Sequence, residues 1–545
     1  MTSLTSILTC ASRFTAGLRL RILTDALVGC VRVGCGLLFI WLSKRLIDIA
    51  VGDAAGTLPP YAVLLALTVV VETACAALQG HLETSTEALL KNRLRHQLFD
   101  RVMNSRWDGK ERFHTGDVVN RLEEDVRLTA ETLCRTLPGT LATLIQAAGA
   151  FLFLCSLNIL LAGVVAGILP IFLLAGKFYT RRMRRLTADI RTADIRVQSL
   201  LQENLQHRTL IMGLQRIAFV SSLLASVQDT LYHKVMHRNR FTQFTRVMML
   251  TGFGAGYFVA FLWGVVQLQQ GAVTFGMLTA FLQLVGQVQR PTADLSRQLP
   301  SFVHAAASVE RLAQLSQLPP EESAPASEET SLTGIRMEHV TFAYPDGRHP
   351  ILHAFSHNFR PGSSTAIVGE TGAGKSTLLR LLLALLRPQS GSIHLYNNEG
   401  RSRQATAATR RSLVYVPQGN SLLSGTIRTN LLLGRPHATD YEIREALHTA
   451  AADFAEAMPQ GLDTPCGEQG TGLSEGQAQR IAIARALLCP GGILLLDEFS
   501  SALDADTEHL LMDRLTAHAA GKTLIFITHR HEIADRCDEI IKLSK

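Results

Sequence analysis

The residues best suited to chemistry form a glycine-rich run that ends in lysine and serine, Gly-Glu-Thr-Gly-Ala-Gly-Lys-Ser at residues 369–376. It follows the apolar stretch 365–368 and opens the helix-forming stretch 377–386. Glycines let successive backbone N–H groups curl around phosphate oxygens at a helix N-terminus, Lys375 adds positive charge, and Ser376 offers a hydroxyl to Mg²⁺. The spacing therefore predicts a site for nucleoside triphosphate. The residues expected to contact it here are Gly369, Glu370, Thr371, Gly372, Ala373, Gly374, Lys375, Ser376 and Thr377.

Two acidic residues follow a second apolar run. Residues 493–496 read as a buried strand that ends in Asp497 and Glu498. A carboxylate at the position of Asp497 suits the coordination sphere of magnesium, and Glu498 is placed to orient or deprotonate an attacking water. Together with the glycine-rich run, the pair predicts hydrolysis as well as binding of the triphosphate.

The composition points to a membrane. The chain has 545 residues, of which 47% are hydrophobic, and a mean hydropathy of +0.17, high for a soluble protein. The net charge of +7 comes partly from short basic clusters at 91–95, 181–185 and 238–240. Each cluster lies near the end of an apolar stretch, where lipid headgroups bind it, so no nucleic-acid partner is expected. The nine cysteines contain no Cys-X-X-Cys pair, which argues against a disulfide framework or a zinc site.

Apolar segments of about 20 residues, the length that crosses a bilayer as a helix, precede the glycine-rich run. The spans are predicted at 22–42, 61–80, 137–157, 160–180, 246–266 and 273–289. The connections after the second and fourth spans are long and carry most of the basic charge. By the positive-inside rule we expect these connections and both termini in the cytoplasm. The expected location is a bacterial inner membrane.

Some polar residues fall within the predicted spans. Arg32 and Glu72 lie at similar depth, so they form a neutralising pair, line a wet cavity that contacts substrate, or mark a misplaced span boundary. Gln146, Gln283 and Gln287 either face an internal cavity or hold helices together.

A change of composition divides the chain. Residues 318–331 are rich in proline, serine and acidic side chains, without apolar periodicity, which is typical of a linker. From residue 332 on, short β-branched runs alternate with helical segments, which predicts an α/β domain. We therefore expect a transmembrane domain at 1–317 and a nucleotide-binding domain at 332–545.

Further motifs in the second domain carry a family resemblance. They are Tyr344 in Thr-Phe-Ala-Tyr-Pro, Gln418 in Tyr-Val-Pro-Gln, Leu-Ser-Glu-Gly-Gln at 473–477, Asp504 in Ser-Ala-Leu-Asp, and His529 in Ile-Thr-His-Arg. With these motifs in this order, the chain resembles a half-size ATP-binding cassette (ABC) transporter of the exporter type. The resemblance implies an all-α six-helix transmembrane domain followed by an α/β P-loop NTPase domain, the cassette.

The resemblance also implies roles for single residues. Tyr344 stacks on adenine, Gln418 contacts magnesium, and His529 holds the γ-phosphate beside the catalytic Glu498 and Lys375. Magnesium ligands are then Ser376, Gln418 and Asp497. The signature segment is expected to reach ATP bound by a second cassette. The remaining nucleotide contacts implied by the resemblance are Ser474, Gly476 and Gln477 of that segment, and Asp504.

One residue of the signature segment departs from the family pattern. Glu475 stands where the common signature has its first glycine, so it is either tolerated variation in the first turn of a helix or the mark of a degenerate site. Because Glu498 is present, the chain's own half of the site is expected to hydrolyse ATP. A homodimer with a second half-transporter is therefore favoured, and a heterodimer remains open.

The expected activity is ATP hydrolysis coupled to transport across, or between leaflets of, a lipid membrane, with ATP and Mg²⁺ as cofactors. Export or lipid flipping is favoured, and the alternatives are an importer of the same architecture and a membrane ATPase with a regulatory role. A soluble cassette ATPase acting on nucleic acid is disfavoured by the apolar spans. The sequence does not identify the substrate.

Overall fold

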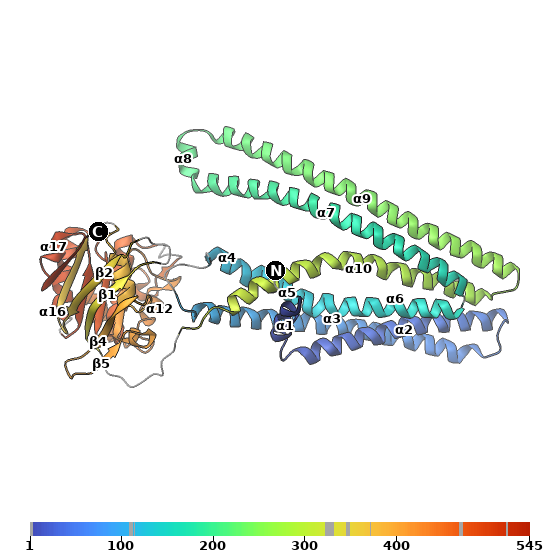
Figure 1. The fold of residues 1–545 in the computed structure, drawn as a ribbon, viewed down its shortest axis with the longest axis horizontal. Coiled ribbons are helices and arrows are strands. Elements are labelled where there is room, and N and C mark those ends of the chain that lie inside the picture. Colours follow the sequence, from blue (N-terminus) through green and yellow to red (C-terminus); the bar gives the residue numbers. More distant parts are fainter. Residues whose placement is uncertain are drawn as a thin grey trace. The chain divides into compact units, whose positions relative to one another are not determined.

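The computed structural model describes residues 4–107, 113, 115–157, 159–321, 332–344, 349–370, 372–467, 472–518 and 521–544. The chain packs as two compact units, shown in Figure 1. The first, here called the membrane unit, comprises Met1–Asp100 and Thr115–Gln317, and the second, the cassette unit, comprises Arg101–His114 and Leu318–Lys545. Most of the expected linker, 322–331, lies outside the described residues.

Long helices make up the membrane unit. They are α1 (Leu4–Phe14), α2 (Arg19–Val51), α3 (Leu58–Met103), α6 (Leu137–Leu157), α7 (Ile159–Gln206), the short α8 (Arg208–Gly213), α9 (Ile217–Gln269) and α10 (Phe275–Ser316). The six predicted spans fall on α2, α3, α6, α7, α9 and α10. Several helices run well beyond the predicted spans, because amphipathic segments with charged residues continue the same helical backbone past the apolar part. The helices α7 and α9 lie side by side and are joined through α8 (Figure 1).

The helices suit a lipid environment. Among the described residues, α2, α3, the run Thr115–Leu157 and α9 are each long and apolar enough to cross a membrane. Large apolar side chains such as Leu67, Phe258 and Leu262 lie exposed on these helices, as lipid-facing residues do. A buried cluster that includes Leu154, Phe281 and other apolar residues of α2, α6, α9 and α10 forms the core.

The run Thr115–Leu157 is not a uniform α-helix. Short helices α4 (Thr115–Asn120) and α5 (Val126–Glu131) alternate with π-helical turns η1 (Arg121–Asp125) and η2 (Thr132–Thr136) before α6 begins. A π turn holds one extra residue and rotates the side chains that follow it. Here η1 ends at Asp125, which is fully buried against α10.

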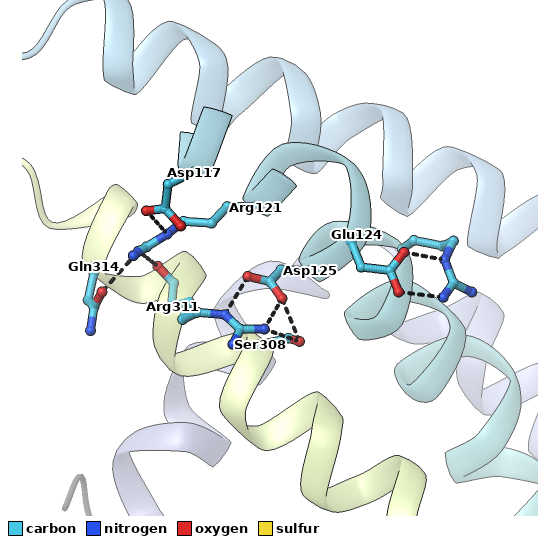
Figure 2. Close-up of polar contacts among 8 residues, drawn as sticks. Asp117, Arg121, Glu124, Asp125, Ser308, Arg311 and Gln314 are labelled. Carbon is cyan, nitrogen blue, oxygen red and sulfur yellow. Dashed lines mark hydrogen bonds and ion pairs between the residues drawn. The ribbon is translucent and has the colours of Figure 1, made fainter. Parts of the chain in front are cut away.

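Asp125 is the centre of a polar cluster between η1 and α10 (Figure 2). Its carboxylate accepts hydrogen bonds from Arg311 Nε at 2.7 Å and from Ser308 Oγ at 2.9 Å, and Arg311 Nη2 contacts the same carboxylate. One turn earlier, Arg121 Nη1 donates to Gln314 Oε1 at 2.9 Å and to the Arg311 carbonyl at 3.1 Å. The last turns of α10 are thus fixed to η1 by charged side chains.

The suggested pair of Arg32 and Glu72 is wrong. Arg32 Nη1 instead donates to Gln79 Oε1 at 3.0 Å, and Gln79 Nε2 donates to Glu83 Oε1 at 3.1 Å. Gln79 lies seven residues beyond Glu72, two helical turns along the same face of α3. The sequence therefore predicted the face of α3 that meets Arg32 correctly, but not the position along α3 at which they meet.

The other polar residues of the spans differ in burial and in hydrogen bonding. Gln146 on α6 donates to Gln287 on α10, which joins two helices, whereas Gln283 is exposed. Asp25, near the start of α2, is buried.

The cassette unit contains two main sheets in its described part. An antiparallel sheet has the order β2 (Leu352–Phe359), β1 (Gly334–Phe342), β4 (Ser390–Tyr396), β5 (Ser402–Gln404). A parallel sheet has the order β11 (Glu539–Leu543), β3 (Ser364–Gly369), β10 (Thr523–Ile527), β9 (Ile493–Asp497), β6 (Leu413–Val416). The strands β3, β9 and β10 are apolar and buried, as strands of a parallel sheet covered by helices must be.

Helices and a small ribbon complete the cassette unit. The longer helices are α11 (Lys375–Leu382), α13 (Asp440–Thr449), α15 (Glu475–Leu488) and α16 (Ala505–His518). The ribbon pairs β7 (Gly425–Thr426) with β8 (Pro465–Cys466). Cys466 is a buried thiol in this ribbon.

Candidate nucleotide-binding and hydrolysis site

One edge of the parallel sheet gathers the predicted chemistry. The strands β3, β10, β9 and β6 are adjacent and parallel, so their carboxyl ends lie on the same edge. Immediately beyond these ends come the glycine-rich loop, His529, Glu498 and Gln418. Ligands of open α/β sheets bind at this edge.

The backbone of the glycine-rich loop explains its composition. Gly372 and Gly374 have φ of 88° and 95°, a region that side chains disfavour. A Cβ at Gly374 would also lie 2.7 Å from Ile351 Cγ2. Gly374 caps α11, so this loop leads directly into a helix N-terminus, where backbone N–H groups can bind anionic oxygens.

Lys375 begins α11 and turns back over the loop. Its Nζ donates to the carbonyl oxygen of Gly369 and lies 3.4 Å from that of Glu370. Thr377, two residues further along the helix, is buried. Thr371 lies outside the described residues.

Glu498 meets two other predicted site residues. Gln418 Nε2 donates to Glu498 Oε2 at 2.5 Å, and His529 Nδ1 lies 3.6 Å from Glu498 Oε1. The backbone of Glu498 has a φ of 45°, although its N–H group still donates to the Ile527 carbonyl at 2.9 Å. Positive φ at a non-glycine residue is strained, and such strain is commonly found at active sites.

Asp497 shares this edge with Tyr415. Burial and the nearby Glu498 carboxylate raise the pKa of Asp497, against the lowering effect of Lys375 and Arg380. The Tyr415 hydroxyl is 3.5 Å from Asp497 Oδ2, and burial, followed by the charge of Asp497, raises the tyrosine's pKa to about 12. A carboxylate whose pKa is raised by burial, with a second carboxylate beside it, fits a place where a cation binds.

Tyr344 stands beside α11. Its hydroxyl accepts a hydrogen bond from Arg380 Nη1 at 3.0 Å and lies 3.4 Å from Thr377 Oγ1. Its ring packs edge-on against Phe342 with a centroid separation of 5.1 Å. The expected adenine-stacking residue is therefore oriented by α11, the same helix that begins with Lys375.

The signature segment forms the start of α15. Ser474 caps the helix: its Oγ accepts from Gln477 N at 3.2 Å, while Gln477 Oε1 accepts from Ser474 N at 2.9 Å. A Cβ at Gly476 would lie 2.6 Å from the Ala502 carbonyl oxygen, so glycine is required there by close backbone approach. Glu475 is exposed in the first turn, where an acidic side chain favours the helix.

Some predicted site residues do not join the group around Glu498. Within the described residues, the side chains of Ser474 and Gln477 form hydrogen bonds to each other's backbone N–H groups. Asp504 accepts from the N–H and hydroxyl groups of Thr507, both at 2.9 Å, and these bonds lower its pKa. Asp504 is thus a helix cap of α16.

Sequence reasoning missed Arg380 and Tyr415. Arg380 follows Thr377 by three residues, one helical turn, so it faces the same side of α11, and this spacing was the available signal. Tyr415 precedes Gln418 by three residues on a strand that pairs with β9.

Comparison with known proteins decides the family. The family model "ABC transporter transmembrane region" matches residues 26–292, and the model "ABC transporter" matches residues 352–501. A relative from Mycobacterium bovis, named fatty acid ABC transporter ATP-binding/permease protein, is 30% identical over 82% of this chain and 71% of its own length. The chain belongs to the ABC transporter family.

Other similarities agree with this assignment. The ABC multidrug transporter mdr2 of Aspergillus fumigatus is 31% identical over 83% of this chain, and the match spans 57% of that longer protein. The solved structure of a bacterial Atm1-family ABC exporter with ATP bound has a TM-score of 0.79, covers 97% of this chain and 94% of its own, and is 24% identical. The fold of the ABC transporter is therefore that of an exporter.

The family assignment confirms several predictions. The chain is a half-size ABC transporter of the exporter type, with a helical transmembrane domain and one ATP-binding cassette, in a multi-pass membrane protein. It uses ATP, and its hydrolysis is coupled to transport. A single cassette implies assembly with another half-transporter.

Proposed function

We propose that this ABC transporter exports apolar or amphipathic compounds, or moves lipids between leaflets, as a homodimer with two ATP sites at the cassette interface. The observation that carries the proposal is the meeting of Gln418, Glu498 and His529 at the sheet edge, next to the loop that holds Lys375. The names of the relatives, which include multidrug and fatty-acid transporters, favour apolar cargo.

Within each cassette, the residues divide the work of hydrolysis. The N–H groups at the start of α11 and the Lys375 ammonium bind the phosphates, and Tyr344 stacks on adenine. The Glu498 carboxylate takes the proton of the attacking water, and His529 donates a hydrogen bond to the γ-phosphate. For this, Gln418 must release the Glu498 oxygen that it now engages.

The residues at this edge fit magnesium. Ser376, Gln418 and Asp497 offer oxygen ligands, which magnesium prefers. Burial and then the charge of Glu498 raise the pKa of Asp497, and a bound cation would offset both effects. The described residues contain no cluster of three or more His, Cys, Asp or Glu side chains able to hold a metal ion. Magnesium in nucleotide sites takes most of its remaining ligands from phosphate and water. When bound, it neutralises charge that develops on the phosphate oxygens.

The second half of each site comes from the partner copy. Ser474, Gly476 and Gln477 lie at the N-terminus of α15, whose N–H groups are suited to the γ-phosphate of ATP bound by the other chain. The short helix α8 supports a second copy, since Leu210, Met212 and Leu214 are exposed at the turn between α7 and α9. Apolar side chains at such a tip need a protein partner.

The proposed location is a bacterial inner membrane, with the cassette and both termini in the cytoplasm and lipid around the spans. The basic clusters at 91–95 and 181–185 support this orientation. An outward direction follows from the exporter architecture. Uptake of labelled cargo by inside-out vesicles, compared with right-side-out vesicles, measures direction, and accumulation only in right-side-out vesicles would indicate an importer.

A complementation experiment tests the shared ATP sites. A chain with Lys375→Ala loses phosphate binding, and a chain with Ser474→Arg blocks the signature helix. Each mixed dimer contains one intact site where a parental dimer has two, and random pairing makes about half of the dimers mixed. We therefore expect ATP trapping in the mixture at about a quarter of the parental level and almost none in either variant alone. Absence of trapping in the mixture contradicts sites shared between two copies.

A further inference from the structure

Arg380, in the last turn of α11, joins the expected adenine residue to a distant segment of the chain. On one side, its Nη1 donates to the Tyr344 hydroxyl at 3.0 Å. On the other, its guanidinium carbon lies 5.0 Å from the centre of the Trp107 ring. That distance is within the range of a cation–π interaction, which is strongest for tryptophan.

Trp107 is held in place by backbone pairing. The segment after α3 runs antiparallel to residues 319–321: Arg106 N donates to the Pro319 carbonyl at 3.0 Å, and Glu321 N donates to the Asn104 carbonyl at 2.9 Å. Trp107 itself packs against the buried cluster of the cassette's sheets. The residues just after a membrane helix are thus part of the cassette unit.

The same segment is tied to the far end of α11. The Glu321 carboxylate accepts two hydrogen bonds from Arg410, at 2.7 and 2.6 Å. Arg410 also donates to the carbonyls of Leu383 and Ala384, both at 2.8 Å, just after α11 ends. A closed ring of contacts therefore runs from α11 through Arg410 and Glu321 to Trp107 and back to Arg380.

We propose that Arg380 and Trp107 position Tyr344, so that the segment following α3 sets the affinity of the cassette for ATP. The proposal rests on the adenine-stacking role of Tyr344 put forward under Proposed function. A tyrosine whose hydroxyl and ring are both fixed loses less freedom when adenine binds, which favours binding without changing the chemical step. By linkage, ATP that stabilises this position of Tyr344 also stabilises the contact between Arg380 and Trp107.

Steady-state kinetics on the reconstituted full-length transporter test this role. For Arg380→Met and Trp107→Ala we expect the KM for ATP to rise about five- to tenfold, with kcat changing less than about twofold, since one hydrogen bond or cation–π contact is lost. The preference for ATP over CTP should fall in parallel, because stacking on Tyr344 favours the larger base. A general loss of structure would not shift this preference.

Matched variants separate charge from position. Arg380→Lys keeps the positive charge near Asp497 but not the planar group, so we expect an intermediate rise in KM. Trp107→Phe keeps a weaker aromatic face and should retain most of the affinity. In the double variant Tyr344→Ala with Trp107→Ala, the two effects should not add, because Trp107 acts through Tyr344.

The outcomes are distinguishable. If Tyr344→Ala leaves the KM and the base preference unchanged, the adenine role of Tyr344 fails. If Tyr344→Ala raises the KM while Arg380→Met and Trp107→Ala do not, the adenine role stands and the positioning inference is overturned. Additive effects in the double variant also overturn it.

Fluorescence gives a second readout that does not depend on turnover. The chain has three tryptophans, so Trp41→Phe with Trp263→Phe leaves Trp107 as the only source of tryptophan emission. ATP should change its emission, and Arg380→Met should remove that change at saturating ATP. An ATP-dependent change that survives Arg380→Met contradicts the contact as the link.

Discussion

Glu498 has a carboxylate that neighbouring side chains already engage. Gln418 donates to one oxygen and His529 lies 3.6 Å from the other, while the backbone of Glu498 adopts a strained positive φ. These contacts orient the Glu498 carboxylate, and the oxygen that Gln418 engages must be freed for the attacking water. The contacts of single residues therefore account for the orientation of Glu498, the proposed general base.

Glu475 is testable at the same scale. It is exposed in the first turn of α15, where a negative charge favours the helix, and Gly476 makes the close backbone approach. Replacing Glu475 by Gly should lower the free energy of unfolding by about 0.5–1.5 kcal/mol and change the ATPase rate less than about twofold. Thermal unfolding and ATPase assays measure both, with Glu475→Gln as the control for charge alone. A rise in rate of about fivefold or more would show that the carboxylate impairs the partner's site.

At the scale of elements, the π turn η1 and α10 are joined by a buried charge. Asp125 is fully buried and depends on Arg311 and Ser308 for its hydrogen bonds (Figure 2). A carboxylate in such a place is costly without its partners. Because α10 ends at Ser316, just before the chain passes to the cassette unit, η1 fixes the end of the last membrane helix.

Arg311→Met should therefore destabilise the membrane unit. We expect a loss of about 2–4 kcal/mol, since Asp125 is left buried and charged without its guanidinium. The control is Arg127→Met, which removes exposed pairs with Glu124 and Glu131 and should cost less than about 1 kcal/mol. Thermal unfolding of the detergent-solubilised protein compares the two variants, and equal losses would contradict a structural role for the pair that Arg311 forms with the buried Asp125.

The sequence predicted helix faces better than helix depth. The spans were placed by hydropathy alone, which put Arg32 level with Glu72, but α2 continues to Val51 and α3 begins only at Leu58. Because the turn between antiparallel helices sets their register, Arg32 lies level with Gln79. Hydropathy does not reveal where a helix ends once its residues turn polar.

The contiguous motifs were the part of the site that the sequence predicted most readily. The loop at 369–376 and the strand ending at Asp497 could be predicted because each motif is contiguous and its neighbours along the chain fix its backbone. The contacts of Arg380 with Trp107 could not, because they join segments that are far apart in the sequence and depend on the pairing of residues 104–106 with 319–321.

At the scale of the whole molecule, one membrane unit and one cassette unit make half of a transporter. The exposed apolar side chains on α2, α3 and α9 require lipid or detergent. We expect the protein to remain in the membrane fraction after high-salt and alkaline washes and to be released only by detergent, as immunoblotting of the fractions can measure. Recovery in the aqueous fraction would contradict a membrane-spanning chain.

The most direct test of ATP-driven transport by this chain is ATP hydrolysis by the purified protein, reconstituted alone in liposomes, beside its Glu498→Gln variant. The account predicts magnesium-dependent hydrolysis by the parental chain, and a variant that binds and traps ATP but hydrolyses it at least about a hundredfold more slowly, as loss of a general base implies. Hydrolysis by the variant at the parental rate would contradict the assigned base. No hydrolysis by the parental chain alone would contradict the homodimer.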